Sequence, residues 1–388
     1  MSLASLQGHS EIRELLARAL RAGALPQSIL LHGPPGVGKE RLGLWLAQLL
    51  VCDAEASEPC GACAACRLVG RLEHPDVHWF FPLPRPDGAS SPDKLRSRLE
   101  EQRAEELQRW RDDPFHQPEF EKAPAHFLAA VRSMHHVASV RPAVGRRKVF
   151  VIGDAELMVP QESSPEAANA FLKLLEEPPP STTLILTSSH PGALLPTIRS
   201  RVLAVRVGLL SEVSLRRLLV DGGLVPADEA LPIARRARGS ARRAIHLARA
   251  EGDGESDERS VGRELLLAAL TSGPLARLGL AHDRRPTGAR SDLVGELDSL
   301  SEWLRDLLAV ASGAHDRVID PASLPILTRA VGQRNMDPAG IMAGIERVAK
   351  ARDLASGNVN PQLILTDLLQ RLQKDLESTG SSSAGART

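Results

Sequence analysis

The chain has 388 residues, enough for two or three domains of roughly 100–200 residues each. Hydrophobic residues make up 43% and charged residues 25%, as in globular proteins, and the formal net charge is zero. A protein that holds nucleic acid by itself usually carries a basic excess, which this chain lacks. No apolar run reaches the roughly 18 residues of a membrane span, and the amphipathic N-terminus lacks a signal peptide's apolar core, so we expect a cytoplasmic protein with no membrane contact.

Hydrophobic periodicity predicts alternating helices and strands over the first half of the chain. We expect helices at 10–23, from 39 onward, and at 93–112, 124–140 and 165–177. We expect strands at 28–32, 76–81, 148–152, 182–187 and 202–207. This alternation predicts a mostly parallel α/β sheet that ends near residue 208.

The strand signal ends after this sheet. Residues 211–250 fit three short helices, the polar stretch 251–259 a linker, and 261–375 an all-helical region. The tail 376–388, rich in Ser, Gly and Ala, is expected to be disordered. Within the first half, 82–123 is a charged insertion, and we interpret the charges of its helix as a solvated face.

A Gly-rich loop, GPPGVGKE, follows the first predicted strand. The spacing of Gly33, Gly38 and Lys39 fits a P-loop, which needs this strand–loop–helix context. Its backbone amides and the Lys39 ammonium are groups that hold phosphates. The next residue should be Ser or Thr, whose hydroxyl ligates Mg²⁺, but it is Glu40. ATP and Mg²⁺ binding are therefore in doubt.

The acidic end of a core strand is the second element of an ATPase. After the predicted strand 148–152, one acidic residue should support Mg²⁺ and the next should polarise the attacking water. Gly153 stands at the first place, Asp154 near the second, and Glu156 a step too far along. Two Mg²⁺-handling positions, at Glu40 and Gly153, are thus altered together, which indicates a site released from hydrolysis.

The cysteines follow the spacing C-x7-C-x2-C-x2-C, and they are Cys52, Cys60, Cys63 and Cys66. Four thiolates complete a closed tetrahedral Zn²⁺ shell with no open position, so the spacing predicts a structural zinc site. The alternatives are two disulfides, which a reducing compartment disfavours, or free core thiols.

Several further segments carry a family resemblance. They are HPDVH at 74–78, NAFLKLLEEPP at 169–179, TIRSR at 197–201, GSAR at 239–242 and NVNPQL at 358–363. With the P-loop and the cysteines, they resemble the AAA+ clamp-loader subunits of bacterial DNA polymerase III over nearly the whole chain, most closely the delta-prime class. The gamma/tau motor class, which keeps the P-loop hydroxyl and both carboxylates, is the alternative. The family usually has Cys where this chain has Val202.

The resemblance implies a domain layout. The first domain is an AAA+ core with a parallel sheet over 1–208, which includes the zinc module 52–66 and the insertion 82–123. A helical lid follows over 209–250. An all-α collar for oligomerisation covers 251–375, and the tail comes last.

The resemblance also implies a function. The chain would be a largely non-hydrolysing stator in a five-subunit ring with gamma/tau and delta subunits, an accessory part of the DNA polymerase holoenzyme. That ring loads the sliding clamp on primed DNA. Arg201 would act as a trans arginine finger on the ATP of a neighbouring subunit, and Ser188 or Ser189 would hold the sensor position. The degenerate nucleotide site would comprise Gly33, Gly36, Gly38, Lys39, Asp154 and Arg242.

Overall fold

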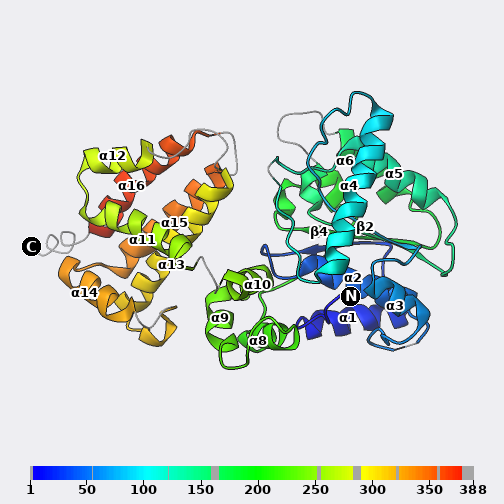
Figure 1. The fold of residues 1–388 in the computed structure, drawn as a ribbon, viewed down its shortest axis with the longest axis horizontal. Helices are drawn as coiled ribbons and strands as arrows, with labels where there is room; N and C mark the ends of the chain where they lie inside the picture. The colour runs from blue at the N-terminus through cyan, green and yellow to red at the C-terminus, as the bar shows by residue number, and fades with distance from the viewer. Residues whose placement is uncertain are drawn as a thin grey trace, which may run out of the picture. The chain divides into compact units, whose positions relative to one another are not determined.

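The computed structural model describes residues 3–54, 56–120, 122–158, 166–250, 255–282, 290–319, 323–355 and 359–377. The chain forms two compact units, Met1–Arg249 and Ala250–Thr388 (Figure 1). Among the described residues, no helix is both long enough and apolar enough to cross a membrane.

A five-stranded sheet forms the centre of the first unit. Its strands are β1 (Ser28–His32), β2 (Val77–Phe80), β3 (Lys148–Ile152), β4 (Thr182–Ser188) and β5 (Leu203–Arg206). They lie in the order β2-β3-β4-β1-β5, and every neighbouring pair is parallel. The predicted parallel sheet is confirmed, and its carboxyl ends meet at one edge, where the P-loop begins.

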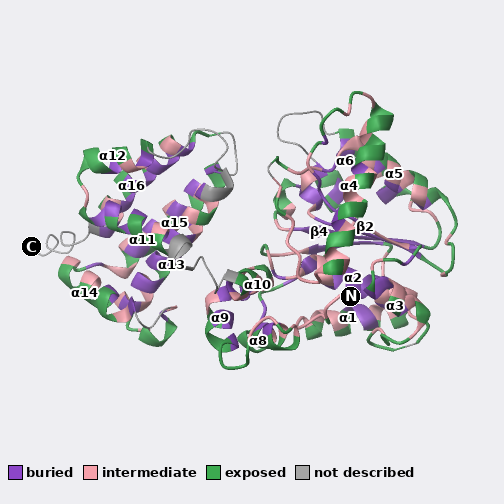
Figure 2. Ribbon diagram, in the orientation of Figure 1, coloured by how far each residue is buried: buried purple, intermediate pink, exposed green. Residues whose placement is uncertain are grey.

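Helices cover both faces of the sheet. They are α1 (Ser10–Arg21), α2 (Lys39–Val51), α3 (Ala64–Gly70), α4 (Pro92–Asp112), α5 (Leu128–Ser139), α6 (Glu166–Glu176) and the short α7 (Pro196–Arg199). Successive strand side chains point to opposite faces. Leu31 therefore packs in the cluster that contains Leu42 of α2, while Leu30 packs in the cluster that contains Phe171 of α6. The inner strands β1, β3 and β4 are buried between these layers, whereas the edge strand β5 is mostly exposed (Figure 2).

Three short helices complete the first unit, as predicted for 211–250. They are α8 (Glu212–Asp221), α9 (Ala230–Ala237) and α10 (Ala241–Ala250). Their apolar stripes meet in a small core of their own, which contains Leu215, Leu219, Ile233 and Ala244. Periodic apolar residues thus build a helical layer distinct from the two clusters of the sheet.

The second unit is helical wherever it is described. Its helices are α11 (Glu255–Thr271), α12 (Pro274–His282), α13 (Arg290–Ala311), α14 (Leu324–Arg334), α15 (Pro338–Ala355) and α16 (Pro361–Glu377). They share one apolar core, with α13 packed against both α11 and α15. The last helix begins at Pro361, inside the predicted 358–363 segment, although Asn358 lies outside the described residues.

Two boundary predictions need correction. Helix α11 already begins at Glu255, so the part 255–259 of the predicted linker is helical, and 251–254 lie outside the described residues. Helix α16 extends to Glu377, so the predicted tail begins later than 376, and 378–388 lie outside the described residues.

Candidate functional site

The P-loop connects β1 to α2, and its glycines are needed for backbone geometry. Gly36 and Gly38 have φ angles of 76° and 92°, in the left-handed region that glycine tolerates best. A Cβ on Gly33 would collide with the carbonyl oxygen of Val207. The strand–loop–helix context of the motif is therefore present, and the N-terminus of α2 faces the loop.

The Lys39 side chain is turned back onto the protein. Its Nζ donates to the carbonyl oxygens of Gly33 and Pro34 at 3.1 and 2.8 Å and to Ser189 Oγ at 2.9 Å. The residue is only 6% exposed, and burial lowers the pKa of its ammonium. Ser189, rather than Ser188, is the serine after β4 that contacts Lys39; Ser188 Oγ accepts the His190 N–H.

Glu40 and Gly153 are spatial neighbours. A Cβ built on Gly153 would lie 2.6 Å from Glu40 Oε1 and 3.0 Å from Glu40 Cδ. The Glu40 carboxyl group thus fills the space that a side chain at position 153 would need. Burial, and next the charge of Asp154, raise the pKa of Glu40 to about 7. Positions 40 and 153, where the sequence departs from the residues expected at a Mg²⁺ site, therefore lie in contact with each other.

The acidic residues after β3 point to different partners. Asp154 has a φ of 40°, and its N–H donates to Thr187 Oγ1 at 3.1 Å. Burial and then the charge of Glu156 raise the pKa of Asp154. Glu156 Oε1 accepts the N–H groups of Ser189 and His190 at 2.8 and 3.1 Å. Glu156 therefore caps the backbone after β4, while Asp154 lines a cavity beside the P-loop.

A cavity of about 240 Å³ lies beside the P-loop. The P-loop with Glu40, Asp154 and Ser189 form one wall, and Arg242 and Ile245 of α10 form another. The Arg242 N–H donates to the Gly36 carbonyl oxygen at 3.0 Å, so the first turn of α10 lies directly on the P-loop. Of the predicted nucleotide-site residues, Gly36, Gly38, Lys39, Asp154 and Arg242 line this cavity, whereas Gly33 does not.

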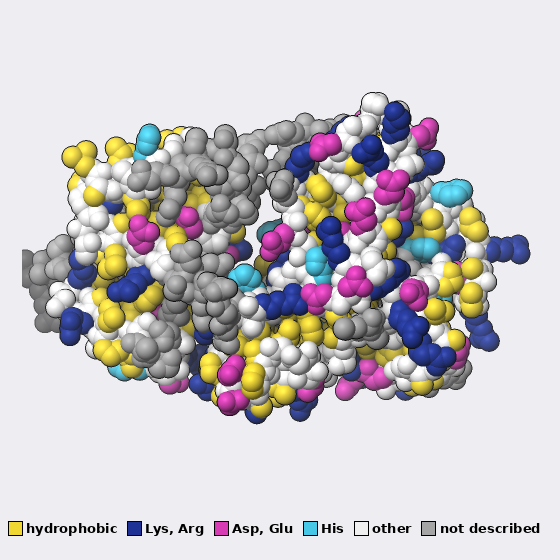
Figure 3. All heavy atoms as spheres, viewed as in Figure 1, with side chains coloured by type: hydrophobic (Ala, Val, Ile, Leu, Met, Phe, Trp, Pro, Cys, Tyr) yellow, Lys and Arg dark blue, Asp and Glu magenta, His cyan; other side chains and the backbone are white. Residues whose placement is uncertain are grey.

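The insertion supplies a further wall that sequence reasoning missed. Residues 110–117, at the end of α4 and just after it, contribute Trp110, Pro114, Phe115, His116 and Gln117 to the cavity lining. Two of these are aromatic in a chain with only 3% aromatic residues, which is the signal that could have drawn attention to the segment. On the face shown in Figure 3, acidic and basic side chains are interspersed, consistent with a solvated outer face for α4.

Arg201 follows α7 and is not among the residues that line the cavity. Its exposed guanidinium lies 2.8 Å from Glu176 Oε1 and donates to the Thr197 carbonyl oxygen at 3.0 Å. Glu176 is the last residue of α6, so α6 and α7 together hold the arginine at the surface. A side chain held in this way is accessible to another molecule.

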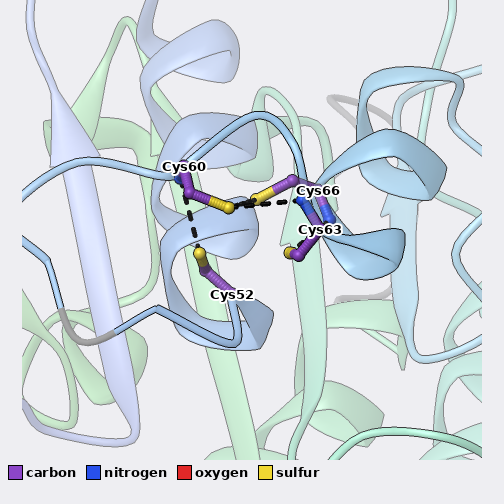
Figure 4. Close-up of side chains that lie close together, drawn as sticks. All are labelled: Cys52, Cys60, Cys63 and Cys66. Carbon is purple, nitrogen blue, oxygen red and sulfur yellow. Dashed lines mark hydrogen bonds between the residues drawn. The ribbon is translucent and has the colours of Figure 1, made fainter.

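The four cysteine sulfur atoms converge, as Figure 4 shows. All lie within 4.8 Å of one another, and the sulfur atoms of Cys60 and Cys66 are 3.9 Å apart. A tetrahedral Zn²⁺ with bonds of about 2.3 Å places sulfur atoms about 3.8 Å apart. The N–H groups of Cys63 and Cys66 donate to the sulfur atoms of Cys60 and Cys63, both at 3.3 Å, which favours thiolates. The cluster therefore fits a metal ion such as zinc.

The HPDVH segment has a structural use. The Asp76 carboxylate accepts three backbone N–H groups, from 143–145, at 2.6, 2.9 and 2.8 Å. These hydrogen bonds outweigh the effect of burial and lower the pKa of Asp76. The segment thereby fixes the turn that leads into β3.

Comparison with known proteins gives the family. Residues 8–210, more than half of the chain, match the model of the family described as "DNA polymerase III, delta subunit". DNA polymerase III subunit delta' of Escherichia coli K12 is 25% identical over 94% of both chains. The Pseudomonas aeruginosa subunit delta' is 34% identical, but the match covers 44% of this chain and 40% of that protein.

Other matches are more partial or more distant. DNA polymerase III subunit gamma/tau of Mycobacterium tuberculosis is 26% identical over 62% of this chain and 35% of that protein. Among solved structures, a DNA polymerase III gamma subunit-related protein from Thermotoga maritima aligns over 94% of this chain and 99% of its own, with 17% identity and a TM-score of 0.39.

Proposed function

The chain belongs to the DNA polymerase III delta-subunit family, and on that premise we propose that it is the delta-prime subunit of a clamp loader. The delta' subunits of Escherichia coli and Haemophilus influenzae align over 94% of this chain, whereas the Mycobacterium tuberculosis gamma/tau relative aligns over 62%. The alternative of a gamma/tau motor is also disfavoured by the site, because the hydroxyl that binds Mg²⁺ is replaced by Glu40.

The contact between Glu40 and Gly153 is the observation that carries the proposal. One carboxyl group occupies the space that a metal-supporting side chain at 153 would require. Lys39 is held by the carbonyl groups of its own loop and by Ser189. To bind a phosphate, Lys39 would have to break three hydrogen bonds. A Mg²⁺ ion would lack the two side chains, at positions 40 and 153, that would otherwise support it. The subunit is therefore a stator that does not hydrolyse ATP efficiently.

Arg201 acts outside its own subunit in this proposal. Its guanidinium is exposed and is not part of the cavity lining, so its useful target is the ATP of a neighbouring motor subunit. A positive charge there stabilises the negative charge that develops on the transferred phosphoryl group. The partners are then gamma/tau and delta subunits in a five-membered ring, and through that ring the sliding clamp and primed DNA.

The other parts have supporting roles. Cys52, Cys60, Cys63 and Cys66 would hold a structural Zn²⁺ between α2 and α3, which stabilises the loop that joins these helices. Helices α8–α10 would be the AAA+ lid, with Arg242 as its sensor residue, and α11–α16 would be the collar that joins the ring. The subunit would work in the cytoplasm with the replisome.

ATP turnover by the purified chain tests the non-hydrolysing role. We expect no turnover above that of the Lys39→Ala variant, which serves as the matched control. Robust turnover that depends on Lys39 would overturn the stator proposal and favour a motor. Co-purification of motor and delta subunits with the chain tests the complex membership independently.

A further inference from the structure

We propose that residues 110–117, here called the strap, fasten helices α8–α10 to the α/β core in place of a bound nucleotide. The strap crosses from the end of α4 to α8 and α10 and lines the same cavity as the P-loop. That the strap acts in place of a nucleotide rests on the proposed non-hydrolysing function. That the strap holds α8–α10 to the core rests on the contacts of the strap alone.

On one side, the strap is anchored to the core. Arg111 donates from Nε and Nη2 to the carbonyl oxygens of Arg71 and Leu72 at 3.1 and 2.9 Å, just after α3. The ring of Trp110 lies 5.2 Å from that of Trp79 in β2. These contacts leave the end of α4 little freedom to move away from the sheet.

On the other side, the strap holds two helices of the 209–250 layer. Arg249 of α10 donates to both carboxylate oxygens of Asp113 at 2.8 and 2.7 Å. Gln117 Nε2 donates to the Arg242 carbonyl oxygen at 2.9 Å. Phe115 packs on Gly222 at the end of α8, where an added Cβ would lie 2.5 Å from Phe115 Cζ.

The position of the strap explains its use. A nucleotide in this cavity would touch the P-loop and Arg242 together and thereby link the core to α10. The strap makes an equivalent link with side chains of the chain itself. An internal link does not change with ATP binding or hydrolysis, so α8–α10 keep one orientation to the core throughout the cycle of the neighbouring motors. A fixed orientation of α8–α10 to the core suits a stator, the subunit that stays unchanged while the motors cycle.

A charge reversal tests the strap in the full-length zinc-loaded chain without nucleotide, by hydrogen–deuterium exchange of peptides from 209–250 and from β1–β5. Asp113→Arg should raise exchange in 209–250 about two- to fivefold, because exposed ion pairs are individually weak. Adding Arg249→Asp should restore protection. Phe115→Ala should raise exchange about tenfold, because its ring contact is lost. The exposed Glu119→Arg is the matched control and should leave exchange unchanged.

Three results would contradict the strap. One is unchanged exchange of 209–250 in Asp113→Arg and Phe115→Ala. Another is a rise that is equal in β1–β5, which would indicate general destabilisation. The third is an Asp113→Arg/Arg249→Asp double variant in which the exchange of 209–250 stays as high as in Asp113→Arg. Millimolar Mg²⁺–ATP tests the two parts of the proposal separately. If ATP restored protection to Asp113→Arg, the fastening by the strap would stand, but its role in place of a bound nucleotide would be wrong. The non-hydrolysing role is tested independently by ATP turnover.

Discussion

Replacing Gly153 with Asp should destabilise the protein, and it should do so because of Glu40. The backbone of Gly153 is not among those with positive φ, so an aspartate is allowed there and only the surroundings oppose it. Its Cβ would meet Glu40 Oε1 at 2.6 Å, well inside van der Waals contact. Overpacking of this kind costs about 1–3 kcal/mol. The new carboxyl group would also face Glu40 and Asp154, and two such charges about 4 Å apart repel by about 4 kcal/mol at an intermediate dielectric unless one takes up a proton.

A double-mutant cycle isolates this contact. Urea unfolding at pH 8 should give a loss of about 3 kcal/mol for Gly153→Asp in the natural background. In a Glu40→Thr background the same change should cost about 1 kcal/mol, a coupling of about 2 kcal/mol. Glu40→Thr/Gly153→Asp also restores the residue types of a Mg²⁺ site. Mg²⁺–ATP at about 100 times its Kd should then stabilise this variant by about 2.7 kcal/mol.

An equal cost of Gly153→Asp in the natural and the Glu40→Thr backgrounds would refute this reasoning. It would mean that the Glu40 carboxyl group does not obstruct position 153. The paired loss of Mg²⁺ positions would then be two unrelated changes. Gly153→Ala, which adds a Cβ without charge, is the control that separates steric overlap from repulsion.

Three further outcomes follow from the site. Because the pKa of Glu40 is raised from its ordinary value of 4.5 to about 7, its contribution to stability is present below pH 4.5 and is lost as pH rises towards 7. The stability of Glu40→Gln relative to the natural protein should therefore rise by about 3 kcal/mol over that window, and parallel pH–stability curves would contradict this. Removing zinc with a chelator, or replacing Cys63 with Ser, should lower Tm by several degrees, and less than half an equivalent of zinc in the untreated protein would count against the site. Glu176→Gln should change ATP turnover of the reconstituted ring by no more than about fivefold, since its ion pair with Arg201 is exposed, and a collapse of turnover would show that Glu176 has a larger role.

Regular patterns made much of the fold predictable. Short continuous apolar runs located β1, β3 and β4 nearly to the residue, because strands of a buried parallel sheet are apolar along their whole length. The Gly spacing located the P-loop, and the cysteine spacing located the cluster of four sulfur atoms. These features depend on residues close together in the chain.

The contacts that give the site its character could not be predicted in the same way. Three such contacts join residues that are far apart in the sequence. Glu40 lies against Gly153, Lys39 donates a hydrogen bond to Ser189, and Arg249 forms an ion pair with Asp113. No periodicity or spacing encodes such pairs, because they depend on how separate elements pack. The role of the strap was hidden for the same reason, since the charges of its neighbouring helix predict a solvated face.

We propose that this subunit supplies an arginine to a neighbouring active site and does not hydrolyse ATP efficiently itself. The most direct measurement is ATP turnover of a clamp loader reconstituted with its own motor and delta subunits, with clamp and primed DNA present. Arg201→Ala should leave the complex assembled and slow turnover markedly, because a trans arginine finger contributes about 10³–10⁵-fold at its site. Arg199→Ala, an exposed arginine in the same turn, should not slow it. Unchanged turnover in an intact complex with Arg201→Ala would contradict the account.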